Sequence, residues 1–392
     1  MNRRRPEHEL LLCIARRELA ANQQAGLRQL LKQTLDWDYL FATASNHGLL
    51  PLLHKHLNSS AAHLVPGHFL NRLKREFVAN SQSVLHLIGK QLKAYRLFQE
   101  NGIAVAIFKG AVLAQMVYGD IALRQAGDID MLIPRRDFAR SKELLESLGY
   151  QMSPPLTPSQ QASHLDFHCE IQFMRDDWFT VVDLHWGLTP RSFVFKLAAE
   201  EVMSRLQPMS LAGTQIKTFG TEDQVLYQAM HGAKHLWRRL ERICSLAELL
   251  RSGETIAWPI VVDRAAKAHG TRMLGLGLRL VERCSEVKVP KDVLAAVDLD
   301  NSMGRLADQI KDQIFAPYSG NPDSTDNSLY NLKIMDRKRD ALASALRAIF
   351  VPTLSDWEAL TLPASLHSLY YAFRPLRLSK VYGASLWRRL TG

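Results

Sequence analysis

Two aspartates separated by one residue are the first feature of this sequence that could do chemistry. Asp128 and Asp130 lie in an otherwise apolar run that ends at Ile133. Because side chains alternate along a β-strand, the two carboxylates would point the same way. Such neighbours repel each other and stay ionised together only beside a cation, and oxygen ligands suit Mg²⁺ or Mn²⁺. The alternative is that Asp128 caps a turn and Asp130 faces water on an edge strand.

A third carboxylate stands in a second β-rich run. Between Val181 and Trp186 the same alternation puts Asp183 and His185 on one face, with apolar residues on the other. Three carboxylates on two strands are the ligand set of a two-metal site, in which two ions clamp the attacking and leaving oxygens of a phosphoryl displacement. Asp128, Asp130 and Asp183 are therefore the predicted catalytic and metal-binding residues.

A third element, Lys109-Gly110-Ala111, stands where a predicted strand meets a predicted helix. Glycine lets the backbone approach a ligand closely, and the free N–H groups at the start of a helix favour a phosphate. We therefore expect Lys109, Gly110 and Ala111 to bind nucleotide phosphates.

Basic residues further along the chain are the remaining candidates for nucleotide binding. One long helix is predicted from Thr221, with Gln224 at capping-box spacing, to about Leu250. Its 3.6-residue period would align one basic stripe, opposed by an apolar face. The stripe consists of His231, Lys234, His235, Arg238, Arg242 and Ser245. Either this stripe is a solvated face, or Lys234 and Arg238 contact a triphosphate with His231 nearby.

Arg124, just before the Asp128–Ile133 strand, either contacts phosphate or pairs with a core carboxylate. The spacing of His231 and His235 is that of a zinc-protease helix, but Gly232 replaces the glutamate such a site needs, which excludes that class.

The elements that must position these residues form an α+β pattern. Helices are expected from residue 7 to about 100, and a mobile loop or linker from Ser319 to Ser328. The predicted strands and helices between them are Ile103–Phe108 (strand), Ala111–Tyr118 (helix), Asp128–Ile133 (strand), Arg136–Leu148 (helix closed by Gly149), Asp166–Arg175 and Phe179–Trp186 (strands joined at Asp176-Asp177). The predicted division is an N-terminal helical region (1–100), an α/β core (101–220), a helical domain closing the cleft (221–318) and a C-terminal helical region (329–392).

Composition limits the function classes. The 392 residues carry 49 Lys and Arg against 39 Asp and Glu, a net charge of +10 that suits an anionic ligand. The cysteines are scattered (Cys13, Cys169, Cys244, Cys284), which argues against a zinc knuckle or a disulfide framework. No apolar run reaches the length of a membrane span, and the N-terminal one is too short for a signal peptide, so we expect a cytoplasmic protein.

The order of these motifs resembles the DNA polymerase beta-like nucleotidyltransferase superfamily. More narrowly, it resembles the uncharacterised bacterial nucleotidyltransferases, over nearly the whole chain. The residues that carry this resemblance are Ile107–Ala111, Tyr118, Arg124, Gly127–Ile133, Leu148–Tyr150, Leu184–Trp186, His231–Trp237 and Arg374–Leu378.

The resemblance implies a small mixed-sheet core flanked by helical regions and a metal-bound NTP, with ATP expected. An acceptor hydroxyl would attack the α-phosphorus and pyrophosphate would leave. Asp128 and Asp130 would bridge the metals, Asp183 would hold the catalytic metal, and the Gly110 and Ala111 amides would hold the β- and γ-phosphates. The sequence departs from the superfamily at Ala111, where Ser or Gly is usual, and has a longer gap from Gly110 to Asp128. It departs from the narrower family at Ser245, where Asp is frequent.

The predicted function is transfer of NMP, with AMP expected, to a hydroxyl of a small molecule, a peptide or protein, or RNA; the basic surplus favours RNA or another acidic acceptor. The alternatives are a non-catalytic nucleotide-binding regulator or toxin–antitoxin partner, and a scaffold whose basic tail, Leu376 to Leu390, contacts acidic lipid. Ordinary helix packing is the favoured interpretation of that tail.

Overall fold

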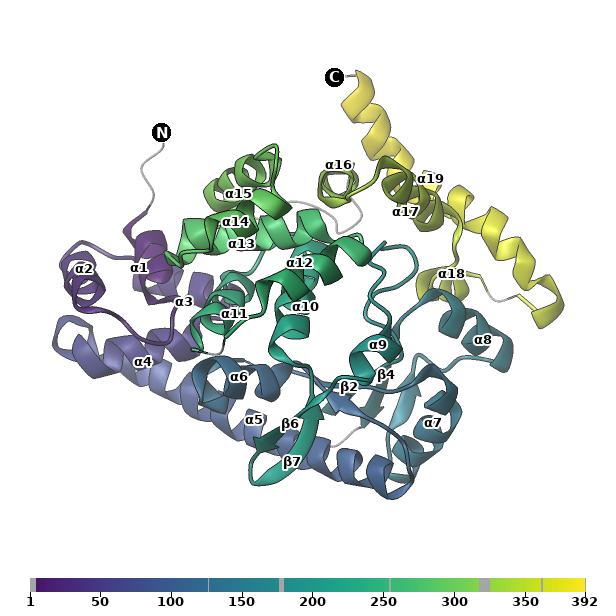
Figure 1. Cartoon of the computed structure of the whole chain (residues 1–392), viewed down its shortest axis with the longest axis horizontal. Coiled ribbons are helices and arrows are strands. Elements are labelled where there is room, and N and C mark those ends of the chain that lie inside the picture. Colours follow the sequence, from purple (N-terminus) through teal and green to yellow (C-terminus); the bar gives the residue numbers. More distant parts are fainter. Residues whose placement is uncertain are drawn as a thin grey trace.

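An N-terminal set of helices leads into the sheet. The computed structural model describes residues 5–391, apart from 126, 176–179, 254, 317–324 and 361. The first helices are α1 (Pro6–Ile14), α2 (Ala21–Leu31), α3 (Trp37–Asn46), α4 (Leu50–Ser60), the 3₁₀ turn η1 (Ala62–Leu64) and α5 (Gly67–Glu100). The predicted helical start is confirmed, and α5 runs along one side of the whole molecule (Figure 1).

The central sheet is mixed, with the order β1-β2-β5-β4-β3. Its strands are β1 (Ala106–Ile107), β2 (Ile129–Leu132), β3 (Gln151–Ser153), β4 (Glu170–Arg175) and β5 (Thr180–His185). Only β2 and β5 run parallel, and all other pairs are antiparallel. Between the strands lie α6 (Gly110–Tyr118), the 3₁₀ turns η2 (Ile121–Leu123) and η3 (Arg135–Asp137), α7 (Phe138–Ser147) and α8 (Pro158–Phe167). The α+β prediction is confirmed, and the sheet is mixed.

Two predicted strands are shorter than expected. The first is reduced to β1 because the Ile103 N–H bonds to the Phe98 carbonyl at 2.9 Å, which ties the start of this run to the end of α5. The second begins at Glu170 and not at Asp166, because Asp166 and Phe167 end α8 and His168 is its C-cap. Thr157 caps that helix by accepting the Gln160 N–H, so a capping box in the Pro-rich loop starts a helix there. The predicted Asp176-Asp177 turn lies outside the described residues.

The sheet separates two apolar cores. Ile129, Met131 and Ile133 pack with Val182 and Leu184 against α5 and α7, as the alternation predicted. Leu132 points into the larger second core, which the N-terminal helices and the helices after the sheet form together. Asp130 and His185 are the buried polar residues on this second face, so the candidate chemistry lies between the sheet and the helices that follow it.

The predicted helix from Thr221 to Leu250 is wrong. After α9 (Ala199–Met203) and the hairpin of β6 (Gln207–Leu211) and β7 (Thr214–Thr218), the chain forms α10 (Thr221–Lys234) and α11 (Leu240–Arg251) with a break between them. Leu236 and Trp237 adopt positive φ angles of 55° and 52° there. The fold-back buries the Trp237 ring against Gly232, and the Trp237 N–H bonds to the Gly232 carbonyl at 2.9 Å. Burial of this large ring compensates the strained backbone.

The capping box predicted at the start of that helix is also absent. Gly220 is the N-cap of α10, and Gln224 uses its side-chain amide to bond the Phe108 carbonyl at 2.9 Å. This contact links α10 to the end of β1, directly beside Lys109.

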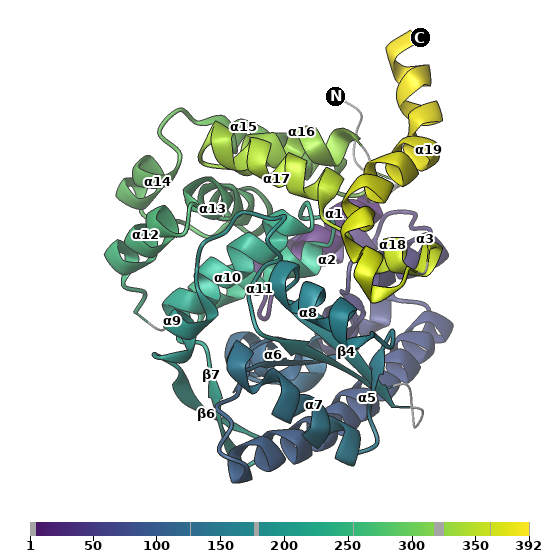
Figure 2. The same ribbon diagram turned by 90° about the vertical axis from the view of Figure 1, so that its right-hand side faces the viewer.

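The remaining helices are α12 (Trp258–Lys267), α13 (Thr271–Ser285), α14 (Lys291–Val297), α15 (Ser302–Gln313), α16 (Thr325–Ile334), α17 (Lys338–Phe350), α18 (Leu354–Ala359), η5 (Ala364–Leu369) and α19 (Tyr370–Thr391). Of the predicted linker, residues 319–324 lie outside the described part, and Thr325 to Ser328 begin α16. The helices α17 and α19 lie on the opposite side of the molecule from α5 (Figures 1 and 2). Within the described part of the chain, none of the helices combines the length and the apolar character that a bilayer crossing requires.

Candidate active site

Two neighbouring strands bring the predicted carboxylates together. In the parallel pair β2–β5, Asp130 is the register partner of Asp183, and His185 follows on the same face. One ligand atom from each of Asp130, Asp183 and His185 lies within 4.8 Å of the others, a spacing that could hold a metal ion. Since β2 is an inner strand and Asp130 is buried, the edge-strand alternative is excluded. Asp128 is exposed and directly precedes β2.

His185 lies between two carboxylates. Its Nε2 is 2.9 Å from Asp130 Oδ1, and its Nδ1 is 2.9 Å from Glu170 Oε2. Burial and the charge of Lys109 oppose protonation, yet the two carboxylates outweigh them and raise the pKa of His185 above its ordinary value. Burial also acts to raise the pKa of Glu170, but the charge of His185 outweighs it and holds that pKa low. The arrangement fixes the orientation of Asp130 through a charged hydrogen-bonded chain.

Sequence reasoning missed Glu170. It is the first residue of β4 and the register partner of His185, so it reaches the same face as Asp130 and Asp183. The alternation of polar and apolar residues from Glu170 to Phe173 could have identified it. The predicted strand began four residues too early, at Asp166, so the sequence did not show that Glu170 is the first residue of the polar face.

Lys109 also contacts Asp130. Its Nζ lies 2.5 Å from the same oxygen, Oδ1, that His185 contacts. Burial opposes the charge of Lys109, but Tyr227 and Asp130 outweigh it and raise its pKa well above the ordinary value. Burial likewise acts to raise the pKa of Asp130, and the charges of Lys109 and His185 hold it below its ordinary value. Asp130 is therefore ionised, with two cationic donors on its Oδ1.

The remaining carboxylates are less well compensated. Burial, followed by the charge of Asp130, raises the pKa of Asp183 to about 6. Its Oδ1 is buried and has no hydrogen-bond partner in the described part of the chain. Desolvation and the charge of Asp130 also raise the pKa of Asp128. An unpartnered buried carboxylate oxygen beside ionised Asp130 fits a divalent cation, because an ion there would supply the missing partner.

Basic groups from the α10–α11 region lie near this acidic cluster, since the charge of Lys234 lowers the pKa of Glu170. Burial, together with the charges of Lys109, Lys234 and Arg242, lowers the pKa of His231 well below its ordinary value. Burial and the charges of Arg242 and Lys234 lower the pKa of His235 to about 3. Both imidazoles are therefore neutral in a region of strong positive potential, which suits a polyanionic ligand.

Arg242 is the least compensated of these cations. Burial, and then the nearby Arg239 and Arg124, lower its pKa to about 10, against the attraction of Glu241. No ion pair joins it to any residue that the structure describes. It was part of the predicted basic stripe, and it reaches this region although the continuous helix does not exist.

The other predicted nucleotide-binding residues fall into two groups. Gly110, with φ +52°, and Ala111 open α6, and the first helical bond of that helix is made by the Val112 N–H to the Lys109 carbonyl. Their own N–H groups thus lie at the free helix end. Arg124 contacts the buried Glu241 at 2.6 Å, which matches the carboxylate alternative, while Arg238 lies in the break between α10 and α11.

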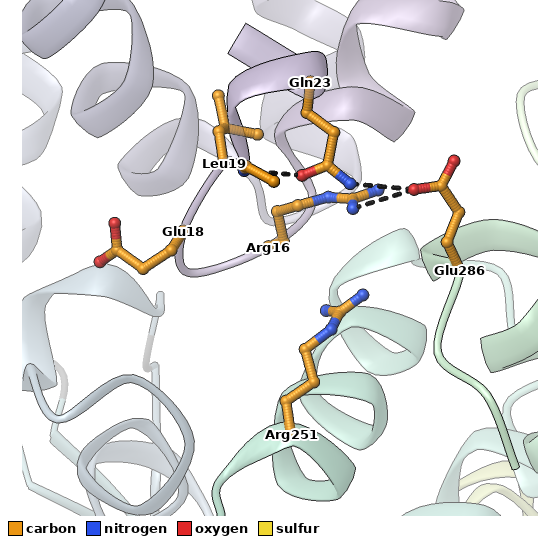
Figure 3. Close-up of a pocket in the computed structure, with 7 residues that line it drawn as sticks. Arg16, Glu18, Leu19, Gln23, Arg251 and Glu286 are labelled. Atoms are coloured by element: carbon orange, nitrogen blue, oxygen red, sulfur yellow. Dashed lines mark hydrogen bonds and ion pairs between the residues drawn. The ribbon is translucent and has the colours of Figure 1, made fainter.

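A cavity of about 410 Å³ lies elsewhere, between the α1–α2 loop, the end of α11 and the end of α13 (Figure 3). Its charged residues already have partners: Glu286 accepts from Arg16 at 3.3 Å and from Gln23 at 2.9 Å, Arg251 contacts Glu248, and Glu18 contacts Lys55. It contains none of the carboxylates of the metal cluster.

Comparison with known proteins identifies a family for this chain. A family model described as "Uncharacterised nucleotidyltransferase" matches residues 33–286, which include every predicted site residue. The chain is also similar to the solution structure of the antibiotic-resistance factor ANT(2'')-Ia, at 18% identity and a TM-score of 0.32, over 48% of this chain and 92% of that one. None of the curated proteins matches this sequence.

Proposed function

Because the chain belongs to the uncharacterised nucleotidyltransferase family, we propose that it transfers an NMP group from an NTP to an acceptor hydroxyl and releases pyrophosphate. The observation that carries this proposal is the ionised Asp130 beside Asp183, whose buried Oδ1 has no hydrogen-bond partner among the described residues, together with the buried cation Arg242 nearby. We propose a polymerase beta-like core, with ATP as the donor and AMP as the transferred group.

The residues present fit Mg²⁺ or Mn²⁺. Asp130 and Asp183 would hold the ion, with Asp128 joining from the exposed end of β2. A bound divalent ion supplies neutralisation of charge that develops on the phosphate oxygens. His185, itself held by Glu170, bonds to Asp130 and keeps it oriented, as the hydrogen-bond partners of metal ligands commonly do.

The basic groups would bind the triphosphate. Arg242 and Lys234 have Glu241 and Glu170 as anionic neighbours but form no ion pair within the described part of the chain, so a triphosphate would give each a close partner. The Gly110 and Ala111 N–H groups offer donors at the free end of α6. Lys109, His231 and Arg238 complete the proposed nucleotide-binding set, whereas the ion pair of Arg124 with Glu241 assigns Arg124 to the carboxylate alternative.

The acceptor hydroxyl needs a proton acceptor. Asp183, which would lie beside the bound ion, is the proposed acceptor of this proton. The hydroxyl oxygen forms the new bond to the α-phosphorus, the bond to the bridging oxygen breaks, and the electron pair leaves with pyrophosphate. The acceptor is a small molecule, a peptide or protein, or RNA.

The test is incubation of the purified protein with each α-labelled NTP, Mg²⁺ or Mn²⁺ and cell extract. We expect label to enter one acceptor class, and to be lost with EDTA or with Asp130→Asn. Asp263→Asn, which alters an exposed ion pair with Lys267 on α12, is the matched control and should transfer normally. Full transfer in EDTA would contradict the metal-dependent proposal. Tight NTP binding without transfer would support the alternative, a non-catalytic regulator or toxin–antitoxin partner.

A further inference from the structure

The helix α17 presents an apolar stripe to solvent. Leu342, Leu346 and Ile349 are 60%, 48% and 42% exposed, and Phe350 beside them is 46% exposed. Their spacing of four and then three residues places them on one side of the helix. The opposite side, with Asp340, packs on the body of the protein. A single exposed leucine needs no explanation, but a continuous stripe on one helix indicates a binding surface.

The surroundings of this stripe are basic. Lys338 and Arg339 are exposed at the first turn of α17 and lie on the side of the apolar residues. From residue 338 to the C-terminus there are eight Lys and Arg and three Asp and Glu. Two of those three acids, Asp340 and Asp356, are buried, and Asp356 is neutralised by two arginines of α19. Among the described side chains from residue 338 to 380, the exposed charges are therefore mostly positive: Lys338, Arg339, Arg347 and Lys380 against Glu358.

We propose that α17 is a docking surface for an anionic lipid bilayer, on which it lies in the plane of the interface. Leu342, Leu346 and Ile349 enter the boundary between headgroups and acyl chains, and Lys338 and Arg339 contact lipid phosphates. An amphipathic helix with an apolar stripe and flanking cations binds by these two contributions together. The proposal requires no spanning helix, and it does not depend on the nucleotidyltransferase proposal.

Charge disfavours a second copy of the chain as the occupant. A symmetric dimer through α17 would place the same surface of both protomers face to face. Lys338 and Arg339 of each protomer would then approach a surface with the same positive charge. From residue 338 to 380, Glu358 is the one exposed acid among the described residues. An anionic bilayer is complementary to the same groups.

The test is co-sedimentation of the full chain with vesicles of phosphatidylcholine alone or mixed with phosphatidylserine. We expect binding to the mixed vesicles that weakens as salt is raised. Leu346→Glu should weaken it by about tenfold or more, since it removes one buried leucine and adds a repelled charge. Leu85→Glu, at a position 57% exposed on α5, is the matched control and should bind like the unaltered protein.

Melting curves check that Leu346→Glu is folded, which its exposed position predicts. No sedimentation with the mixed vesicles at low salt would overturn the proposal. An equal loss for Leu85→Glu would also overturn it. A dimer in sedimentation velocity that Leu346→Glu dissociates would assign the stripe to a second copy and overturn it as well. Label transfer from NTP is a separate readout and is expected to be unchanged in Leu346→Glu.

Discussion

The break between α10 and α11 predicts that Gly232→Ala destabilises the protein, whereas a continuous helix predicts that it stabilises the protein. A Cβ added at Gly232 would lie 2.4 Å from two carbons of the Trp237 ring. Favourable carbon contacts are about 3.5–4.0 Å, so the ring must move by more than about 1 Å. It cannot easily do so, because Gly277 packs against the same ring and a Cβ there would already lie 3.1 Å from it. Gly232→Ala should therefore destabilise the protein by about 1–3 kcal/mol, the usual cost of overpacking.

In an uninterrupted helix the same substitution would have the opposite effect, since Ala is preferred to Gly in a helix interior by about 0.5–1 kcal/mol. Gly89→Ala provides that reference. Gly89 lies inside α5, and a Cβ there would have nothing within 4 Å.

The assay is urea unfolding of the two variants beside the unaltered protein, with the slope of each transition compared. A lower midpoint for Gly232→Ala and a higher one for Gly89→Ala are expected. If both variants are stabilised alike, the fold-back of Trp237 onto α10 is refuted. A second check is Trp237→Leu, which should reduce the cost of adding Gly232→Ala because the two positions are coupled.

The remaining predictions concern three polar groups. His47 accepts the Leu240 N–H on Nδ1 at 3.1 Å, and burial, then Arg239, lower its pKa to about 4. As pH falls, the unfolded chain therefore binds a proton at His47 before the folded protein does, and the unaltered protein loses up to ~3 kcal/mol of stability between about pH 6.5 and pH 4. His47→Asn keeps a hydrogen-bond acceptor but cannot titrate, so this loss should be absent from its unfolding titrations. Asp183 has its pKa raised to about 6, so its ionisation costs stability as pH rises through that value. In EDTA, Asp183→Asn should stabilise the protein by roughly 1–3 kcal/mol at pH 8 and by almost nothing near pH 4; a destabilised variant at pH 8 would contradict this. Arg242→Gln should raise KM for NTP by about 10- to 100-fold through loss of a charge-assisted contact of ~1.5–3 kcal/mol, with kcat retained; an unchanged KM would make Arg242 a structural residue.

The acidic cluster was predictable because its chemistry is local. The alternation around Asp130 and around Asp183 fixes which face each carboxylate takes, and burial of the intervening apolar residues confirms it. The parallel pairing that makes Asp130 and Asp183 neighbours is a property of topology, which the two segments alone do not contain. Glu170 was missed for a related reason, since only the register of β4 on β5 shows that it reaches His185.

The break in the predicted long helix could not be read from periodicity. The apolar and basic residues from Thr221 to Leu250 keep a helical period across it, and neither Leu236 nor Trp237 favours a positive φ. What decides the conformation is a long-range contact, the burial of Trp237 between Gly232 and Gly277. Tertiary packing overrides local propensity there, and it also directs Arg242 to the candidate site.

Direct titration of Mn²⁺ by electron paramagnetic resonance, with a non-hydrolysable ATP analogue present, tests most directly whether Asp130 and Asp183 form a metal–nucleotide site. It needs no knowledge of the acceptor. We predict Mn²⁺ binding that depends on the analogue, weakens by about tenfold or more in Asp183→Asn and is unchanged in Asp263→Asn. Equal Mn²⁺ affinity in Asp183→Asn and the unaltered protein, or no binding at all, would contradict the account.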